Sequence, residues 1–207
     1  MKHDHIHWLG HASFWIDDAG TIIYIDPWKL PDKCPKADII LITHPHFDHF
    51  SLEDIREIQK QDTIVAGPVE ASRQVHATAL TVEPDNEYSV GKVSFRTVPA
   101  FNLGKQFHPK KEHWVGYVIT LSGGQVIYHT GDTDSTPEMR RVECDIALLP
   151  CGGTYTMTAK EAGDAANSMK VKAVIPMHWG DLVGSEADAQ EVARVFKGET
   201  IIKEPEG

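Results

Sequence analysis

The segment Thr43-His44-Pro45-His46-Phe47-Asp48-His49 constrains this chain more than any other part of its sequence. Three imidazoles and one carboxylate fall within six residues, in the pattern H-x-H-x-D-H. Residues 39–42 form an unbroken apolar run just before them, which is typical of a buried strand. Imidazole and carboxylate ligands together suit zinc, and also iron or manganese. The sequence therefore predicts a metal site at the end of a rigid strand.

The spacing of these ligands favours two ions. Side chains two residues apart in an extended chain point the same way, so His44 and His46 can hold one ion. Asp48 and His49, beyond a turn, can reach a second ion beside it. Two later segments, residues 128–133 and 176–180, also place a potential ligand just after an apolar strand. Asp132 is expected to bridge the two ions, and His178 to complete the second site.

Length and charge limit the class of protein. The chain has 207 residues, enough for one domain with a sizeable core. Its net charge of −10 argues against binding to nucleic acid or to anionic membranes, and no apolar run approaches the roughly 18 residues of a membrane span. Three widely spaced cysteines suit a reducing compartment, and the polar start Met1-Lys2-His3 lacks a signal-peptide pattern. We expect a cytoplasmic protein that acts on a small molecule; its oligomeric state is left open.

The pattern of apolar residues predicts a β-rich segment followed by alternating strands and helices, twice over, with the second half beginning near Tyr88. Strands are expected at residues 5–16 with a break at Gly10-His11, and at 21–25, 38–42, 63–66, 88–98, 115–121, 125–128, 145–149, 171–177 and 201–202. Helices are expected at residues 51–61, 158–169 and 185–196, with a short one after Gly67-Pro68. Such an order favours two sheets packed face to face and covered by helices.

In the order of its motifs, the chain resembles the metallo-β-lactamase-fold hydrolases. The H-x-H-x-D-H run, Gly131-Asp132-Thr133 and the late His178 carry the resemblance. Residues 9–13 (LGHAS) and 26–28 (DPW) resemble a branch that includes the L-ascorbate-6-phosphate lactonase-like and N-acyl phosphatidylethanolamine phospholipase D-like proteins. The resemblance covers essentially the whole chain. It implies a single domain over residues 1–207 of the α/β (α+β) class, a four-layer αββα sandwich with two mixed sheets, and a hydrolytic site that usually holds zinc at one sheet edge.

One position departs from the family pattern. The superfamily usually supplies a third histidine to the first metal after the strand that here ends near Val98, but this chain has Asn102 there. A neutral amide oxygen is a poor zinc ligand. His108 and His113 follow six and eleven residues later, and either could replace it, or neither. We favour His108, which is closer and whose backbone Pro109 would stiffen.

The predicted activity is hydrolysis by a metal-bound hydroxide, which attacks an ester, lactone, amide or phosphodiester bond. Asp48 and Asp132 are the predicted catalytic residues, and Asp48 is expected to steer the hydroxide or accept a proton. Two alternatives remain: a noncatalytic metal-binding module on the same fold, and a phosphodiesterase or nuclease.

Several other residues are candidates for the surroundings of the metals. His11 and Asp26 are expected to orient ligands. The candidates for the pocket wall are Trp28, Phe47, Trp114 and Trp179. Residues 152–156 either supply backbone N–H groups or Tyr155 to an oxyanion, or form a plain strand-to-helix loop.

Overall fold

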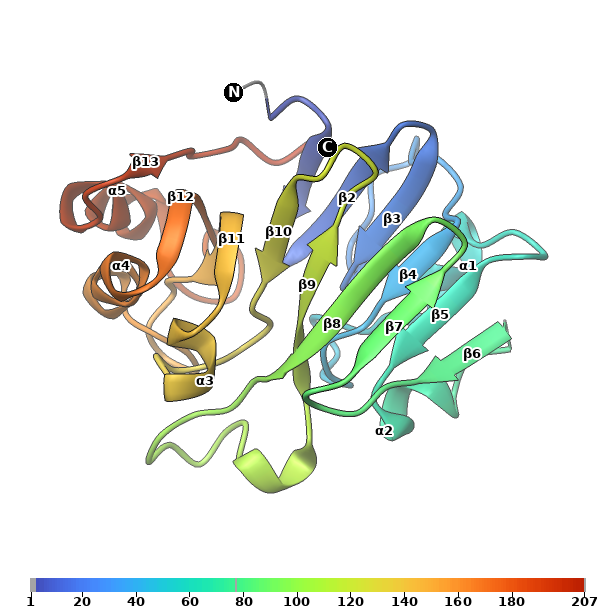
Figure 1. Ribbon diagram of the computed structural model, residues 1–207, viewed down its shortest axis with the longest axis horizontal. Helices are drawn as coiled ribbons and strands as arrows, with labels where there is room; N and C mark the ends of the chain where they lie inside the picture. The colour runs from blue at the N-terminus through green and yellow to red at the C-terminus, as the bar shows by residue number, and fades with distance from the viewer. Residues whose placement is uncertain (1–2, 77, 207) are drawn as a thin grey trace.

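Two β-sheets stacked face to face form the centre of the computed structural model, which describes residues 3–76 and 78–206 (Figure 1). Met1 and Lys2 of the predicted polar N-terminus lie outside the described residues. The first sheet has the strand order β1-β2-β3-β4-β5-β6, and the second β13-β12-β11-β10-β9-β8-β7. The strands of the first sheet are β1 (Ile6–Gly10), β2 (Ser13–Asp18), β3 (Thr21–Ile25), β4 (Ile39–Leu41), β5 (Ile64–Gly67) and β6 (Thr78–Thr81). Those of the second are β7 (Glu87–Val90), β8 (Val93–Pro99), β9 (Val115–Thr120), β10 (Val126–His129), β11 (Glu143–Pro150), β12 (Lys170–Met177) and β13 (Glu199–Thr200).

Both sheets are mixed and follow the same plan. β1 to β3 pair antiparallel and β3 to β6 pair parallel. In the second sheet β7 to β10 pair antiparallel and β10 to β13 pair parallel. The second sheet begins at Glu87, close to the predicted start near Tyr88. Two mixed sheets with flanking helices confirm the predicted fold class.

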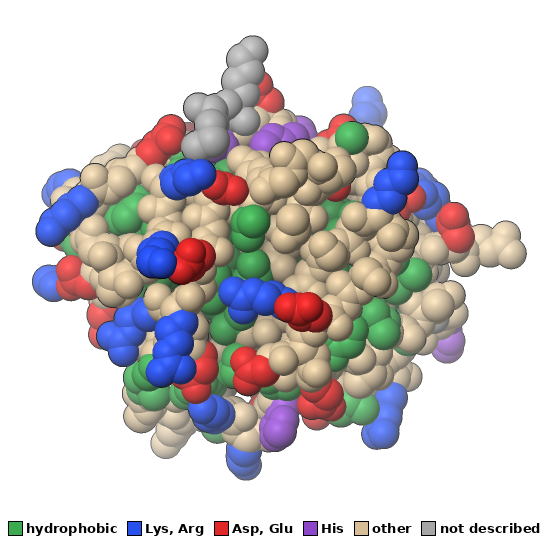
Figure 2. Space-filling view, in the orientation of Figure 1, with side chains coloured by type: hydrophobic (Ala, Val, Ile, Leu, Met, Phe, Trp, Pro, Cys, Tyr) green, Lys and Arg blue, Asp and Glu red, His purple; other side chains and the backbone are tan. Residues whose placement is uncertain are grey.

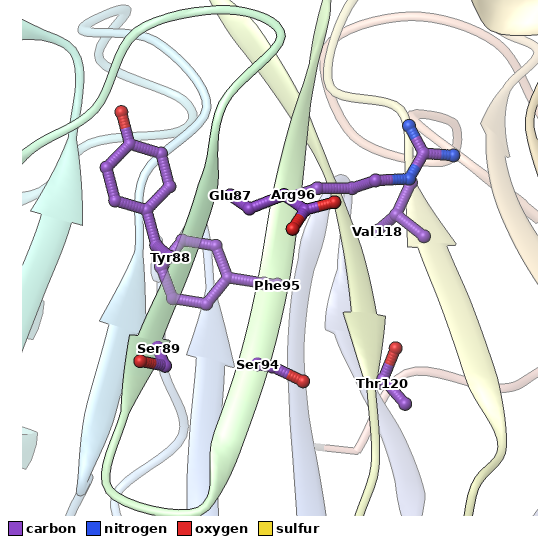
Figure 3. A pocket seen from close by; sticks show the side chains of 8 residues that line it. All are labelled: Glu87, Tyr88, Ser89, Ser94, Phe95, Arg96, Val118 and Thr120. Atoms are coloured by element: carbon purple, nitrogen blue, oxygen red, sulfur yellow. The ribbon is translucent and has the colours of Figure 1, made fainter.

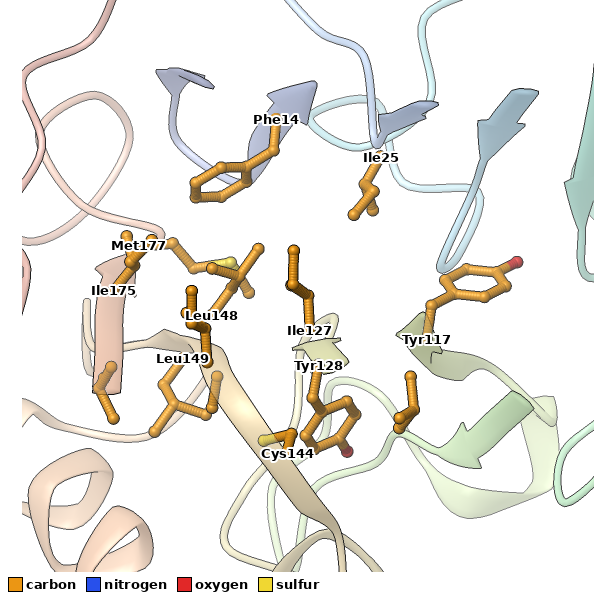
Figure 4. Packing of buried hydrophobic residues seen from close by; sticks show 14 of the residues in the cluster. Phe14, Ile25, Tyr117, Ile127, Tyr128, Cys144, Leu148, Leu149, Ile175 and Met177 are labelled. Carbon is orange, nitrogen blue, oxygen red and sulfur yellow. The ribbon is translucent and has the colours of Figure 1, made fainter. Parts of the chain in front are cut away.

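The main core lies between the sheets, because alternate side chains of each strand point into the gap. Figure 4 shows Phe14 and Ile25 of the first sheet facing Ile127 and Leu148 of the second. Tyr128, next to Ile127 in the chain, points to the opposite side of its sheet. The central strands are thus apolar on both faces, and this explains their continuous apolar runs.

Helices cover the outer faces of the sheets. They are α1 (Leu52–Ile58), α2 (Val69–Ser72), α3 (Pro137–Arg140), α4 (Ala159–Ser168) and α5 (Glu186–Val195), with a 3-10 turn at Lys110–Glu112. α4 begins at a capping box in which Thr158 and Glu161 each bond the other's backbone N–H, as the sequence predicts. α4 and α5 pack on each other and on β12, at the left of Figure 1.

The outer face of β7, β8 and β9 is more polar. Figure 3 shows the side chains that line a hollow there, with Ser89, Ser94 and Thr120 in a row beside the cross-strand neighbours Glu87 and Arg96. On the face shown in Figure 2, basic side chains lie interspersed with acidic ones. No helix among residues 3–76 and 78–206 is long and apolar enough to cross a bilayer.

Some element boundaries differ from the prediction. Residues 88–98 are two strands, because Gly91 adopts a positive φ of 59° and closes a β7–β8 hairpin. β6 and α3 were not predicted; β6 is short and largely exposed, so it lacks an apolar signal. The last strand pairs at Glu199–Thr200 instead of residues 201–202.

Candidate metal centre

The ends of β4, β10 and β12 meet at one edge of the sandwich, the lower edge in Figure 1. They bring together His44, Asp132 and His178. Four site residues have left-handed backbone conformations that non-glycine residues rarely adopt: His11 (φ 50°), Asp26 (49°), His108 (54°) and His178 (60°). Each such residue turns the chain sharply, which costs on the order of 1–3 kcal/mol. Half of the eight non-glycine residues with such a backbone in the described chain thus belong to the site.

One group of candidate ligands contains His44, His46 and His108, whose ring nitrogens lie within 4.8 Å of one another. Nε2 of His108 is 3.1 Å from Nδ1 of His46. The structure therefore brings His108, from the loop between β8 and β9, to the place predicted for it. His113, the predicted alternative, has a mostly exposed side chain and lies 3.7 Å from Glu83, away from this group.

A second group contains Asp48, His49 and His178 together with His11. Nε2 of His49 and Nε2 of His178 each lie 3.9 Å from Oδ2 of Asp48. His11 lies closer, with Nε2 3.0 Å from the same oxygen. His11 was expected only to orient ligands; its hydrogen bond to Asp48 suits that role, although its nitrogen is also within reach of an ion.

Asp132 lies between the two groups. Its Oδ2 is 3.9 Å from Nε2 of His44 and 3.4 Å from that of His108, while Nε2 of His178 approaches to 3.2 Å. Its Oδ1 is 3.3 Å from Nε2 of His49. One carboxylate thus faces both groups, as a bridging ligand must. Gly131 precedes it at φ 62°, where a Cβ would lie 3.0 Å from Cβ of Thr43, so this close approach requires glycine.

The donor atoms fit divalent ions in spacing and chemistry. Ligands about 2.0–2.1 Å from a tetrahedral zinc ion lie about 3.3–3.4 Å apart. The separations above range from 3.0 to 3.9 Å. Within the described residues, the Nε2 atoms of His44, His49 and His178 and Oδ1 of Asp132 are buried and have no hydrogen-bond partner. Unpartnered buried polar atoms are costly, and an ion would satisfy them together.

The electrostatics also favour metal binding. Burial lowers the pKa of His44 well below its ordinary value and lowers that of His108 to about 4, so both imidazoles stay neutral, as ligands must be. Burial opposes ionisation of Asp132, but His178 and His49 outweigh it and hold the pKa of this carboxyl well below its usual range. The Asp48 carboxyl is also buried, yet the hydrogen bond from His11 lowers its pKa to about 2.

Asp26 orients one histidine of each group through hydrogen bonds on the side away from the candidate ions. Its Oδ2 accepts from Nδ1 of His49 at 2.8 Å and from the Thr43 hydroxyl at 2.6 Å, and its Oδ1 accepts from the Thr43 N–H at 2.7 Å. Because the Thr43 hydroxyl donates to Asp26, its oxygen is free to accept from Nδ1 of His44, 2.9 Å away. Both imidazoles then hold a proton on Nδ1 and direct Nε2 to the centre. Burial opposes protonation of His49, but Asp132 and Asp26 outweigh it and raise the pKa of this imidazole well above its ordinary value, so an ion would displace a proton from its Nε2. The expected orienting role of Asp26 therefore extends to two histidines.

Asn102 occupies the position where the family usually has histidine, but its amide group serves the loops around the site. Its Nδ2 donates to the carbonyl oxygens of Tyr155 (2.7 Å) and Phe107 (3.1 Å), and its N–H donates to that of His108 (2.8 Å). It therefore joins the β8–β9 loop to the β11–α4 loop.

The two groups and Asp132 together form what we call the metal-binding cluster. A cavity of about 360 Å³ opens beside this cluster. The lining residues are His46, Phe47, Asp48, Phe107, His108, Asp132, Tyr155, His178 and Leu182. Of the predicted wall residues, Phe47 lines the cavity, and so does Tyr155, which was named as a candidate oxyanion contact. The three tryptophans do not: Trp114 packs against His44 and His46, and Trp179 against Trp8. Phe107 and Leu182 were missed, because a single apolar residue in a loop gives no sequence signal.

Fold and cluster together define a member of the metallo-β-lactamase class. The model of the beta-lactamase superfamily domain matches residues 5–178 of this chain. The chain belongs to this superfamily, and within it to the UPF0173 metal-dependent hydrolase family. It is 34% identical to a UPF0173 protein of Pyrococcus furiosus over 89% of this chain and 86% of the relative. It is also 34% identical to a UPF0173 metal-dependent hydrolase of Methanosphaera stadtmanae, over 95% of this chain and 92% of the relative.

Solved structures agree with this assignment. The crystal structure of a protein described as a metal-dependent hydrolase from Parabacteroides distasonis is 29% identical, with a TM-score of 0.87 over 97% of this chain and 93% of that one. A metallo hydrolase from Ignicoccus hospitalis is 23% identical, with a TM-score of 0.79 over 98% and 95% of the two chains, and supports the fold alone. The resemblance to the lactonase-like and phospholipase D-like branch stays a prediction.

Proposed function

We propose that the protein hydrolyses an ester or lactone bond of a small molecule, with two divalent ions, zinc first among them, at the cluster. The single observation that carries the proposal is the position of Asp132, whose two carboxylate oxygens face histidines of both groups. Two ions bound on either side would lower the pKa of a bound water and polarise the substrate's carbonyl oxygen. The lactone alternative also follows from the resemblance to the lactonase-like branch.

The predicted ligand sets agree with the two groups. His44, His46 and His108 would hold one ion, and Asp48, His49 and His178 the other, with Asp132 between them. Hydrogen bonds orient two of these ligands: Asp26 orients His49 directly and His44 through Thr43.

Asp48 has two roles in this proposal: it is a ligand of one ion, and it accepts a hydrogen bond from the attacking water. It lies at the cavity floor, and its low pKa keeps the carboxylate ionised at neutral pH, so it can accept a hydrogen bond from the attacking water. His11 fixes the orientation of the carboxylate through Oδ2. Water adds its oxygen to the carbonyl carbon, the bond from that carbon to the leaving oxygen breaks, and the leaving oxygen receives a proton. The products are an acid and an alcohol.

The alternative substrates receive less support. Phosphodiester cleavage usually recruits Arg or Lys near the metals. Lys105 is bound to Asp134, Lys110 to Glu138, and Lys111 lies 3.7 Å from Glu112. A noncatalytic module would not require an ionised Asp48 at the floor of an open cavity.

The test is hydrolysis of ester, lactone and phosphodiester panels with zinc, manganese and iron supplied separately. We expect turnover of esters or lactones that Asp48→Asn lowers by at least about 100-fold, in the range of general acid–base effects. Asp62→Asn, on the exposed loop after α1, is the matched control and should keep wild-type turnover. Wild-type turnover in Asp48→Asn would overturn the mechanism.

A further inference from the structure

Large apolar side chains crowd around the mouth of the cavity above the metal-binding cluster. Six large hydrophobic residues are exposed in the described part of the chain: Phe47, Leu103, Phe107, Tyr155, Leu182 and Ile202. Four of them line this one cavity. Exposed apolar side chains scattered singly need no explanation, but apolar groups gathered around one cavity indicate an apolar ligand. We call Phe47, Phe107, Tyr155 and Leu182 the apolar rim.

The apolar rim is assembled from four different loops. Phe47 follows β4, Phe107 precedes β9, Tyr155 follows β11 and Leu182 follows β12. Only the convergence of these loops at the sheet edge brings the four side chains together. Three of these loops, those after β4, before β9 and after β12, also supply candidate ligands.

Part of the rim is held in place before any ligand arrives. The rings of Phe107 and Tyr155 meet edge to face at 4.9 Å, and Asn102 bonds the backbone carbonyl oxygens of both residues. The ring of Phe47 meets that of Trp28 edge to face at 6.0 Å. Preorganised walls increase affinity because less side-chain entropy is lost on binding.

The side chains that line the cavity disfavour a substrate with a charged group at the apolar rim. No Lys or Arg is present among the described residues that line the cavity. Lys105 of the β8–β9 loop is bound to Asp134 and to the Thr156 carbonyl oxygen, and Lys29, which lies over the Trp28 ring, is paired with Asp181. A charged group held at the rim would lose water without gaining a partner, which is costly. The cavity volume of about 360 Å³ lies at the small end of the range for small-molecule sites.

We propose that the substrate is a small uncharged ester or lactone whose apolar chain or ring lodges in the apolar rim while its carbonyl group reaches the metals. The inference rests on the proposed function. It makes Phe107 and Leu182 specificity-determining residues, because each contributes an exposed apolar face and neither is a candidate metal ligand.

The first experiment compares kcat/KM of the zinc-loaded enzyme for 4-nitrophenyl acetate, butyrate and the hemisuccinate, which is similar to butyrate in length but anionic. Burial of each added methylene should raise kcat/KM about fourfold, so butyrate should exceed acetate about 15-fold. The hemisuccinate should be no better than acetate. Phe107→Ser and Leu182→Ser should each reduce the advantage of butyrate over acetate to a few-fold.

Leu103→Ser is the matched control, because Leu103 is a similarly exposed residue of the same loop as Phe107 but does not line the cavity. It should keep the full butyrate advantage. If the hemisuccinate equals butyrate, or the rim variants behave like the control, the inference is wrong while the proposed function stands.

A second readout does not depend on turnover. Isothermal titration with acetohydroxamate, butyrohydroxamate and the hydroxamate of succinic acid compares three ligands that share one metal-binding group. Butyrohydroxamate should bind about 15-fold more tightly than acetohydroxamate, and this gain should fall in Leu182→Ser. If no ester is turned over, the proposed function fails, but equal affinity for all three hydroxamates would separately overturn the inference.

Discussion

Asp26→Asn should weaken both metal sites by reversing the tautomers of two histidines. The substitution keeps the shape of the buried side chain but replaces one acceptor oxygen with a donor NH₂ group. The Thr43 N–H, 2.7 Å from Oδ1, needs an acceptor, so the new amide oxygen must stay there. The NH₂ group then lies where Oδ2 accepts from His49 and from the Thr43 hydroxyl.

The exchange of an acceptor for a donor changes the tautomer of both His49 and His44. The NH₂ group donates to Nδ1 of His49, which moves the imidazole proton to Nε2, the atom that faces Asp132. Its second hydrogen is donated to Oγ1 of Thr43, which must then donate to Nδ1 of His44. Neither Nε2 can bind an ion in that tautomer.

The expected loss is about 10- to 100-fold in affinity at each site, equal to about 1.4–2.8 kcal/mol, as for other residues that orient metal-binding histidines. Zinc affinity measured by competition with a chromophoric chelator gives this value directly. Asp38→Asn is the control, because that carboxylate accepts from the Ile22 N–H at 2.8 Å and from Lys60 but contacts no candidate ligand. Wild-type zinc affinity in Asp26→Asn, or an equal loss in Asp38→Asn, would show that Asp26 does not set the tautomers of His44 and His49.

Three further predictions concern stability. Gly152→Ala should destabilise the protein by about 1–3 kcal/mol and weaken zinc binding, because the new Cβ would lie 2.3 Å from the carbonyl oxygen of His178; urea denaturation with and without zinc measures both effects. The metal-free protein should lose stability as the pH falls from 6.5 to 4, because burial lowers the pKa of His108 to about 4 and only the unfolded chain takes up that proton in this range; a flat profile in denaturant titrations at several pH values would contradict this. Zinc at about 100 times its dissociation constant should raise the free energy of unfolding by about 2.7 kcal/mol per site, and a melting temperature unmoved by zinc would exclude specific binding to the folded chain.

The fold could be predicted well wherever an element has a strong local signal. The apolar runs before His44 and His178 predict buried strands, and the capping box at Thr158 predicts the start of α4. The hairpin at Gly91 was missed because the residues on both sides of the turn continue an acceptable strand pattern. β6 was missed because its pairing with β5 supplies the stability that its own side chains do not.

The candidate site was predictable where ligands lie close together in the sequence or at strand ends. His108 could be favoured over His113 from distance along the chain, but only the folded loop shows that His108 faces His46 while His113 points outward. The connection from Asp26 through Thr43 to His44 could not be predicted, since it depends on hydrogen bonds between adjacent strand ends. The apolar rim was equally hidden, because its four residues come from four loops.

Anomalous X-ray scattering from a zinc-loaded crystal would show directly whether two ions bind at the cluster. We expect two zinc peaks on either side of the Asp132 carboxylate, one contacting His44, His46 and His108 and the other contacting Asp48, His49 and His178. A protein that crystallises with zinc in excess but shows no peak at this cluster, or only one, would contradict the proposed dinuclear centre.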